Sequence, residues 1–128
     1  MNGENLLAEA IAMKDEIVGN RRTIHRAPEV GAHLPQTVEF VEKRLQELGY
    51  EPCELGGGVA AEITGADTGR CILLRADMDA LKVEEKTDLP FRSENGCMHA
   101  CGHDMHAAML LGAAKLLKAH QSELKGTV

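Results

Sequence analysis

The chain has 128 residues, of which 44% are hydrophobic and 27% charged, a balance typical of one globular domain. Its 20 acidic side chains outnumber the 14 basic ones and give a formal net charge of −6, which argues against a nucleic-acid partner. No stretch reaches the ~20 apolar residues that cross a bilayer, so no membrane partner is expected. Four cysteines without a secretion signal favour the cytoplasm.

Two helices are predicted in the first part of the chain. Apolar residues recur at helical spacing from about Asn5 to Arg26, and Pro28 ends this helix. A second amphipathic segment begins near Pro35, which suits a first helical turn, and ends at Gly49, which suits the position after a helix.

The pattern then changes to that of strands. An extended segment at 51–55 precedes two predicted strands at 59–65 and 70–76, joined by a turn-rich sequence. The continuous apolar run Cys71–Leu74 is typical of a strand buried on both faces. A loop of roughly 25 residues follows, and loops this long in compact domains are commonly functional.

A third helix is predicted to start at Asp104, a good N-cap residue, and to fade near Glu123. Thr127 and Val128 have the composition of a strand that follows a crossover helix, although a frayed polar tail would look the same. The fold class is therefore predicted to be α/β, with helices packed on a mixed sheet that is incomplete within these residues.

The loop before this helix contains the densest group of metal-binding residue types. The segment CMHACGHDMH holds two cysteines, three histidines and one aspartate. Cys101 and His103 are two residues apart across a glycine, a good half-site for zinc, cobalt, nickel or manganese, and His99 or His106 could support them. The alternatives are a buried cysteine beside a solvated histidine, and a closed zinc site that also uses Cys97, which the spacing disfavours.

A second group of candidate residues stands where the predicted buried strand ends. Asp77 and Asp79 are two residues apart in RADMDAL, and sites in open α/β sheets lie at the carboxyl ends of strands. Two neighbouring carboxylates need a cation, an arginine or water to offset their charge. The alternative is a solvated strand end. Together, the two groups favour a metallohydrolase.

Three other titratable residues are not expected to belong to the site. His25 is predicted to be a helix-end cap or a core histidine, and Glu84 and Glu85 are predicted to lie on a solvated face.

Three motifs in order, RRTIHRAPEVG, RADMDAL and MHACGHDMHAAMLLGAA, resemble the metal-dependent amidohydrolases typified by hippurate hydrolase and the indoleacetyl-amino-acid hydrolases. These belong to the metallopeptidase family of the aminoacylases and carboxypeptidase G. The resemblance implies a zinc-peptidase-like α/β catalytic domain and hydrolysis of the amide bond of N-acyl amino acids. It also implies a two-metal centre of divalent ions, with manganese or zinc preferred over cobalt or nickel, and homo-oligomeric full-length relatives.

The resemblance also implies roles for particular residues. Cys101 and His103 match metal ligands, and Asp79 matches a carboxylate that orients a ligand or the general base. Asp77 matches a neighbouring position, and Asp104 is placed among the residues that support the ligands.

In the family, the general-base glutamate, later metal ligands and a lid domain that often dimerises all follow the segment matched here. We therefore expect residues 1–128 to be a truncated N-terminal part of the catalytic domain, inactive alone. The alternative is a non-catalytic metal-binding or interaction module derived from the same family.

Overall fold

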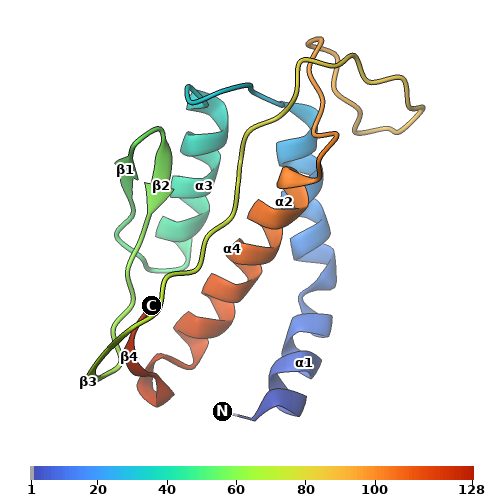
Figure 1. Ribbon diagram of the computed structural model, residues 1–128. Coiled ribbons are helices and arrows are strands. Elements are labelled where there is room, and N and C mark those ends of the chain that lie inside the picture. The colour runs from blue at the N-terminus through green and yellow to red at the C-terminus, as the bar shows by residue number, and fades with distance from the viewer. Residues whose placement is uncertain (1) are drawn as a thin grey trace.

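The computed structural model describes residues 2–128, and the side chains of all of these except Asp67 and Thr68. Helix α4 lies along the middle of the molecule, with α2 on one side and α3 on the other, and the two termini lie toward the same end (Figure 1). Two small two-stranded sheets complete the fold. The prediction of an α/β arrangement with an incomplete sheet is confirmed.

The first predicted helix is two helices, α1 (Gly3–Ala12) and α2 (Lys14–Arg26). The backbone of Met13 leaves helical geometry, with φ −89° and ψ 5°, so the helix is interrupted there. Asn2 caps α1 by accepting a hydrogen bond from the Glu4 amide at 2.8 Å. The apolar spacing continues across the break, so periodicity alone predicts one helix.

Helix α3 (Pro35–Glu47) agrees with its prediction, because both of its ends carry strong local signals. Pro35 occupies the first turn, where its missing N–H costs nothing. Gly49 adopts φ +83°, a left-handed conformation that favours glycine and reverses the chain toward Tyr50.

The strands form two separate pairs. β1 (Cys53–Leu55) and β2 (Gly58–Ala60) pair antiparallel as a hairpin beside α3. β3 (Ala66–Cys71) pairs parallel with β4 (Lys125–Thr127), and α4 (His103–Ala119) lies between them in sequence. A short 3₁₀ helix at Gln121–Glu123 leads into β4. The predicted strand at the C-terminal residues is therefore confirmed.

The predicted buried strand at Cys71–Leu74 is wrong. β3 ends at Cys71, and the chain continues to the start of α4 without a further helix or strand. Ile72, Leu73 and Leu74 are 61%, 87% and 44% exposed. An apolar run is buried only where other segments cover it, and in residues 2–128 β4 reaches only to the start of this run.

The core lies between α3, α4 and the small sheets. Its buried members are Val41, Leu45, Tyr50, Ile63, Leu111, Ala114 and Leu124. The hydroxyl of Tyr50 donates to the carbonyl oxygen of Ala114 at 2.8 Å, and burial raises the pKa of this phenol. This bond ties the end of α3 to the middle of α4.

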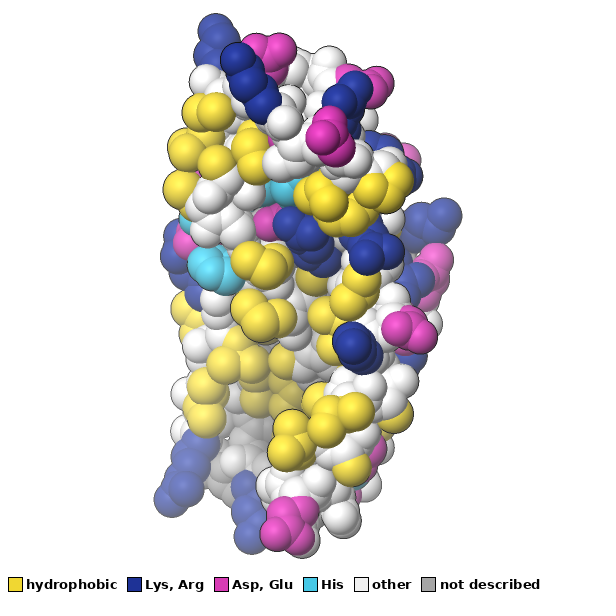
Figure 2. Space-filling view, turned by 90° about the vertical axis from the view of Figure 1, so that its right-hand side faces the viewer, with side chains coloured by type: hydrophobic (Ala, Val, Ile, Leu, Met, Phe, Trp, Pro, Cys, Tyr) yellow, Lys and Arg dark blue, Asp and Glu magenta, His cyan; other side chains and the backbone are white. Residues whose placement is uncertain are grey.

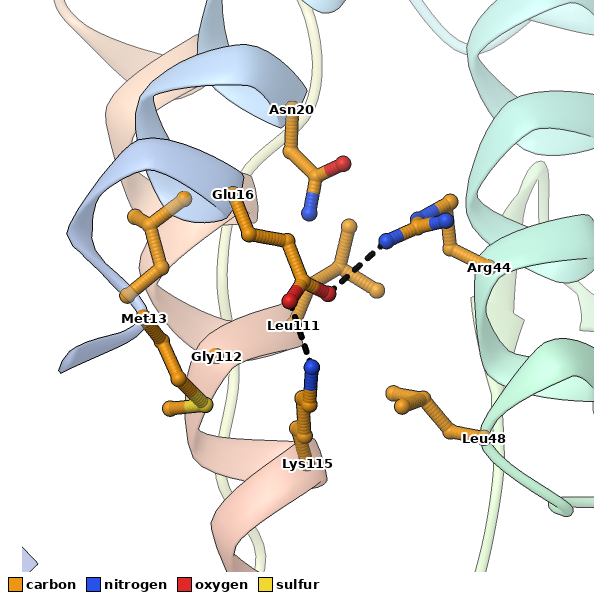
Figure 3. Close-up of a pocket in the computed structure, with 9 residues that line it drawn as sticks. Met13, Glu16, Asn20, Arg44, Leu48, Leu111, Gly112 and Lys115 are labelled. Carbon is orange, nitrogen blue, oxygen red and sulfur yellow. Dashed lines mark hydrogen bonds and ion pairs between the residues drawn. The ribbon is translucent and has the colours of Figure 1, made fainter. Parts of the chain in front are cut away.

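An ionic contact joins the three long helices. Glu16 of α2 lies between Arg44 of α3 and Lys115 of α4, and its two carboxylate oxygens contact one cation each (Figure 3). Because all three side chains are partly exposed, the contribution to stability is about 1 kcal/mol or less per pair. Its geometric effect is to fix how α2 and α3 flank α4.

One face of the molecule carries apolar side chains between groups of acidic and basic ones, without an extended basic area (Figure 2). Among the described residues, none of the helices is both long enough and apolar enough to span a membrane.

Candidate metal centre

The first turn of α4 carries the histidines of the candidate site. The helix begins at His103, and Gly102 precedes it with φ +81°. A side chain at this glycine would be strained and would approach the Cε atom of Met105. The prediction that Asp104 is the N-cap is wrong, because Asp104 lies inside the first turn and is fully buried.

The chain that enters the long loop brings two carboxylates to this turn. The Nδ1 atom of His103 lies 2.9 Å from Oδ1 of Asp79 and 3.0 Å from its carbonyl oxygen. Both neighbours only accept hydrogen bonds, so Nδ1 carries the proton and donates. In the neutral ring this places the lone pair on the other nitrogen, Nε2, which is the state in which a histidine binds a metal.

Three side chains converge at this point. Asp77, His103 and His106 each offer one ligand atom, and these atoms all lie within 4.8 Å of one another. The two imidazole rings stack, with centroids 5.5 Å apart and planes inclined by 29°. One carboxylate oxygen and two imidazole nitrogens suit zinc, manganese or cobalt, so the residues fit a divalent metal. Arg75, which is largely exposed, forms an ion pair with the same Asp77 carboxylate.

Cys101 is exposed and is not among the three residues whose ligand atoms converge. Its role as a ligand stays a prediction. His99 is only 4% exposed, and neither of its ring nitrogens has a hydrogen-bond partner among the described residues. Burial lowers the pKa of His99, and the nearby charge of Asp104 opposes that shift only in part.

The side chain of Asp104 is buried and forms its contacts with residues of α2. Its Oδ2 accepts from Nε of Arg21 and lies 2.7 Å from Nδ1 of His25, while Oδ1 has no partner among the described residues. His25 is buried, as one of its two structural interpretations predicts. The predicted supporting role of Asp104 toward the metal ligands stays a prediction.

One interaction near the site has no signal in the sequence, the contact between His25 and Glu85. Glu85 is 8% exposed and contacts His25, so its predicted solvated position is wrong, whereas Glu84 is exposed as predicted. His25 and Glu85 are 60 residues apart in the chain, and no local spacing signals that they meet.

Comparisons with known proteins point to one sequence family. The sequence family described as Peptidase family M20/M25/M40 matches residues 73–128, which include both carboxylates and both histidines. The chain is 48% identical over 119 residues to an N-acetyl-L-cysteine deacetylase of Bacillus subtilis, covering 91% of this chain and 29% of that protein. It is 45% identical over 118 residues to an IAA-amino acid hydrolase of Arabidopsis thaliana, and this match covers 89% of this chain and 27% of that protein.

A solved structure shares the fold. A Bacillus subtilis protein described as a dinuclear metal binding peptidase from the M20 family superposes with a TM-score of 0.86 and 42% sequence identity. The match covers 91% of this chain and 34% of that protein. The chain thus spans about a third or less of the length of these relatives. By its match over residues 73–128 and by its fold, the chain resembles part of the M20 peptidase family, and the relatives compared include a deacetylase, a hydrolase and a peptidase.

Proposed function

We propose that this chain is part of an enzyme that hydrolyses the amide bond of N-acyl amino acids at a divalent-metal centre. The observation that carries this proposal is the group formed by Asp77, His103 and His106, in which Asp79 leaves the Nε2 atom of His103 available. The names of the relatives support the substrate class, since they include a deacetylase of N-acetyl-L-cysteine and a hydrolase of an amino-acid conjugate.

His103 is the central ligand in this proposal. Cys101, named by the resemblance, and the pair Asp77 and His106, named by the geometry, are the candidates that complete its surroundings. When bound, a divalent metal polarises a scissile carbonyl and lowers the pKa of a water molecule. Asp79 fixes the ring of His103, and Asp104 holds the first turn of α4 from the interior.

The proposal includes a general base outside residues 1–128. We propose that these residues form the N-terminal part of the catalytic domain of a longer polypeptide, which supplies a base carboxylate and further ligands. The coverage of the relatives supports this, and so does an open groove of about 530 Å³ between α3, α4 and the segment 73–79. The walls of this groove are mainly aliphatic. The exposed side chains of Leu73 and Leu74 line it, and the exposed Ile72 directly precedes them in the chain. Additional strands of the domain would cover these three side chains. A cytoplasmic location and homo-oligomeric assembly stay predictions from sequence.

Cobalt binding tests the metal centre and its ligands. We expect the 128-residue chain to bind Co²⁺ weakly, and His103→Ala to abolish this binding. A thiolate ligand adds a charge-transfer absorption in the near ultraviolet, so Cys101→Ser should remove that band. Cys97→Ser is the matched control and should keep it. If the unmodified chain binds cobalt without this charge-transfer band, Cys101 is not a ligand. If the unmodified chain binds no cobalt, the proposed metal centre is contradicted.

Hydrolysis of N-acetyl-L-cysteine and N-benzoyl-glycine tests the catalytic part. We expect no turnover by the 128-residue chain and chelator-sensitive turnover by a longer polypeptide that contains it. Chelator-sensitive turnover by the chain alone would contradict the placement of the base. A longer polypeptide that binds metal but hydrolyses neither compound would favour the non-catalytic module.

A further inference from the structure

Four ionisable side chains form a cluster that joins α2, the long loop and α4, and all of them except Arg21, which is 26% exposed, are buried. Arg21 donates through Nε to Oδ2 of Asp104 at 2.7 Å, and Nδ1 of His25 lies 2.7 Å from the same oxygen. The other ring nitrogen of His25 lies 3.0 and 3.1 Å from the two oxygens of Glu85. His25 is 2% exposed, Asp104 0% and Glu85 8%.

Both ring nitrogens of His25 take part in this cluster. Nδ1 contacts Oδ2 of Asp104 and lies 3.4 Å from Nη2 of Arg21, whereas Nε2 contacts the carboxylate of Glu85. Buried charges are tolerated only when each has its partners, so removing any one member leaves another uncompensated. The four side chains therefore act as one unit.

The loop is fastened to this unit by further contacts. Glu85 also accepts from the backbone N–H of Ser93 at 2.7 Å and from the hydroxyl of Thr87 at 2.6 Å. The ring of Phe91 lies edge-on to His25, with centroids 5.6 Å apart, and the guanidinium of Arg21 lies 5.2 Å from the centroid of Phe91. These contacts hold the loop at the end of the molecule where α2 ends and α4 begins (Figure 1).

We infer that His25 is a positioning residue of the candidate metal centre: it holds Asp104 and Glu85 from opposite sides, and so fixes the first turn of α4 against the loop. Asp104 is the direct neighbour of His103 in this turn, and His106 lies one turn further. The loop begins with Asp77 and Asp79, which meet these histidines. A movement of the turn that broke the bond between His25 and Asp104 would therefore separate the ligand atoms.

His25 is not a ligand in this inference. It is buried, and both of its nitrogens are occupied by carboxylates. Metal ligands must keep their distances within a few tenths of an ångström, and residues that orient them typically change affinity by about 10–100-fold when mutated. A purely structural role predicts something different: lower stability with unchanged metal affinity of the folded protein. The inference rests on the proposed function only in that a metal binds at this centre.

The test is His25→Gln in the full 128-residue chain, titrated with Zn²⁺ and Co²⁺ at a temperature where circular dichroism shows every variant folded. We expect about 10-fold weaker binding and an altered visible spectrum of the cobalt adduct. His120→Gln is the matched control, because His120 bridges two carboxylates, Glu9 and Glu123, at the other end of α4. Its affinity should stay within about 2-fold of the unmodified chain. Unchanged affinity and an unchanged cobalt spectrum in His25→Gln would overturn the inference.

A metal-free measurement separates this inference from the proposed function. The amides of Met105 and His106 donate to the carbonyl of Gly102, so their hydrogen exchange reports the first turn of α4. In His25→Gln we expect these amides to exchange faster relative to those near the end of α4, even if the unmodified chain binds no metal. Unchanged relative exchange would overturn the inference. If His25→Gln does not fold, Glu85→Gln replaces it, because this substitution weakens the contact between His25 and Glu85. We then expect the same weaker metal binding and the same faster amide exchange in the first turn of α4.

Discussion

His103 donates through Nδ1 to Asp79, whose carboxylate and carbonyl oxygens lie 2.9 and 3.0 Å away. This contact orients the imidazole and selects its tautomer, so we predict that Asp79→Ala weakens metal binding about 10-fold. The loss of metal affinity is limited because the backbone carbonyl of residue 79 still accepts a hydrogen bond from Nδ1 of His103. Calorimetric titration with Zn²⁺ measures it, and Asp88→Ala, an exposed carboxylate of the same loop, is the control. Equal affinities of the two variants would remove Asp79 from the site.

Glu85 makes the stability of the fold sensitive to acid. Burial raises the pKa of Glu85, but hydrogen bonds from Thr87, Ser93 and His25 outweigh it and lower the pKa from 4.5 to about 2. The lowered pKa means that the folded state favours the ionised form. The contribution of Glu85 is therefore complete above about pH 4.5 and is lost as the pH falls toward about 2.

We predict that Glu85→Gln is less stable than the unmodified chain at pH 7, by about 1–3 kcal/mol, and that the difference shrinks between pH 4.5 and pH 2.5. Urea unfolding at these pH values measures both quantities. The exposed neighbour Glu84 supplies the control, since Glu84→Gln should have almost no effect at any pH. A constant difference across the pH range would show that the hydrogen bonds do not depend on the charge of Glu85.

How much of this could be predicted from sequence depends on where each signal lies. Helix α3 follows its prediction because Pro35 and Gly49 act within one turn. The apolar run Cys71–Leu74 predicts a buried strand, yet its burial depends on segments that residues 2–128 do not place over it. Sequence identifies an apolar surface, whereas only the rest of a fold determines what covers it.

The candidate site shows the same division. The two aspartates and His103 were selected from short motifs, and the structure brings Asp77 and Asp79 to that histidine. His106, left open in the sequence, joins this group because the first turn of α4 stacks its ring on that of His103. The cluster around His25 had no local signal, since its members come from three segments and gain their partners only after folding.

His120 connects the ends of α1 and α4. Hydrogen bonds to Glu123 and then to Glu9 raise the pKa of His120, so the folded state favours its protonated form. This contribution is complete below the ordinary pKa of 6.5 and is lost as the pH rises through the raised value. None of the residues of α1 is buried, and the bond between His120 and Glu9 ties this helix to the end of α4.

We therefore predict that amide exchange within α1, corrected for its intrinsic pH dependence, becomes faster between pH 6 and pH 8.5. His120→Gln should exchange quickly throughout this range, because it cannot carry the charge. His33→Gln, a substitution of an exposed histidine, should behave like the unmodified chain. Exchange in α1 that is independent of pH would show that other contacts hold this helix.

Gly65 lies where β3 and β4 come together. Its amide donates to the carbonyl of Gly126, the next amide donates to the carbonyl of Leu124, and a Cβ atom at residue 65 would collide with that Leu124 carbonyl oxygen. Because the obstacle is backbone, Gly65→Ala can be accommodated only by displacing the paired strand. We predict that Gly65→Ala lowers the free energy of unfolding by about 1–3 kcal/mol.

Gly19→Ala is the matched control: this exposed glycine lies inside α2 with open space around it, so alanine should stabilise the chain by about 0.5–1 kcal/mol. Urea unfolding of both variants at pH 7 measures the two effects, and a Gly65→Ala variant as stable as the unmodified chain would show that the close approach of these strands does not constrain the fold.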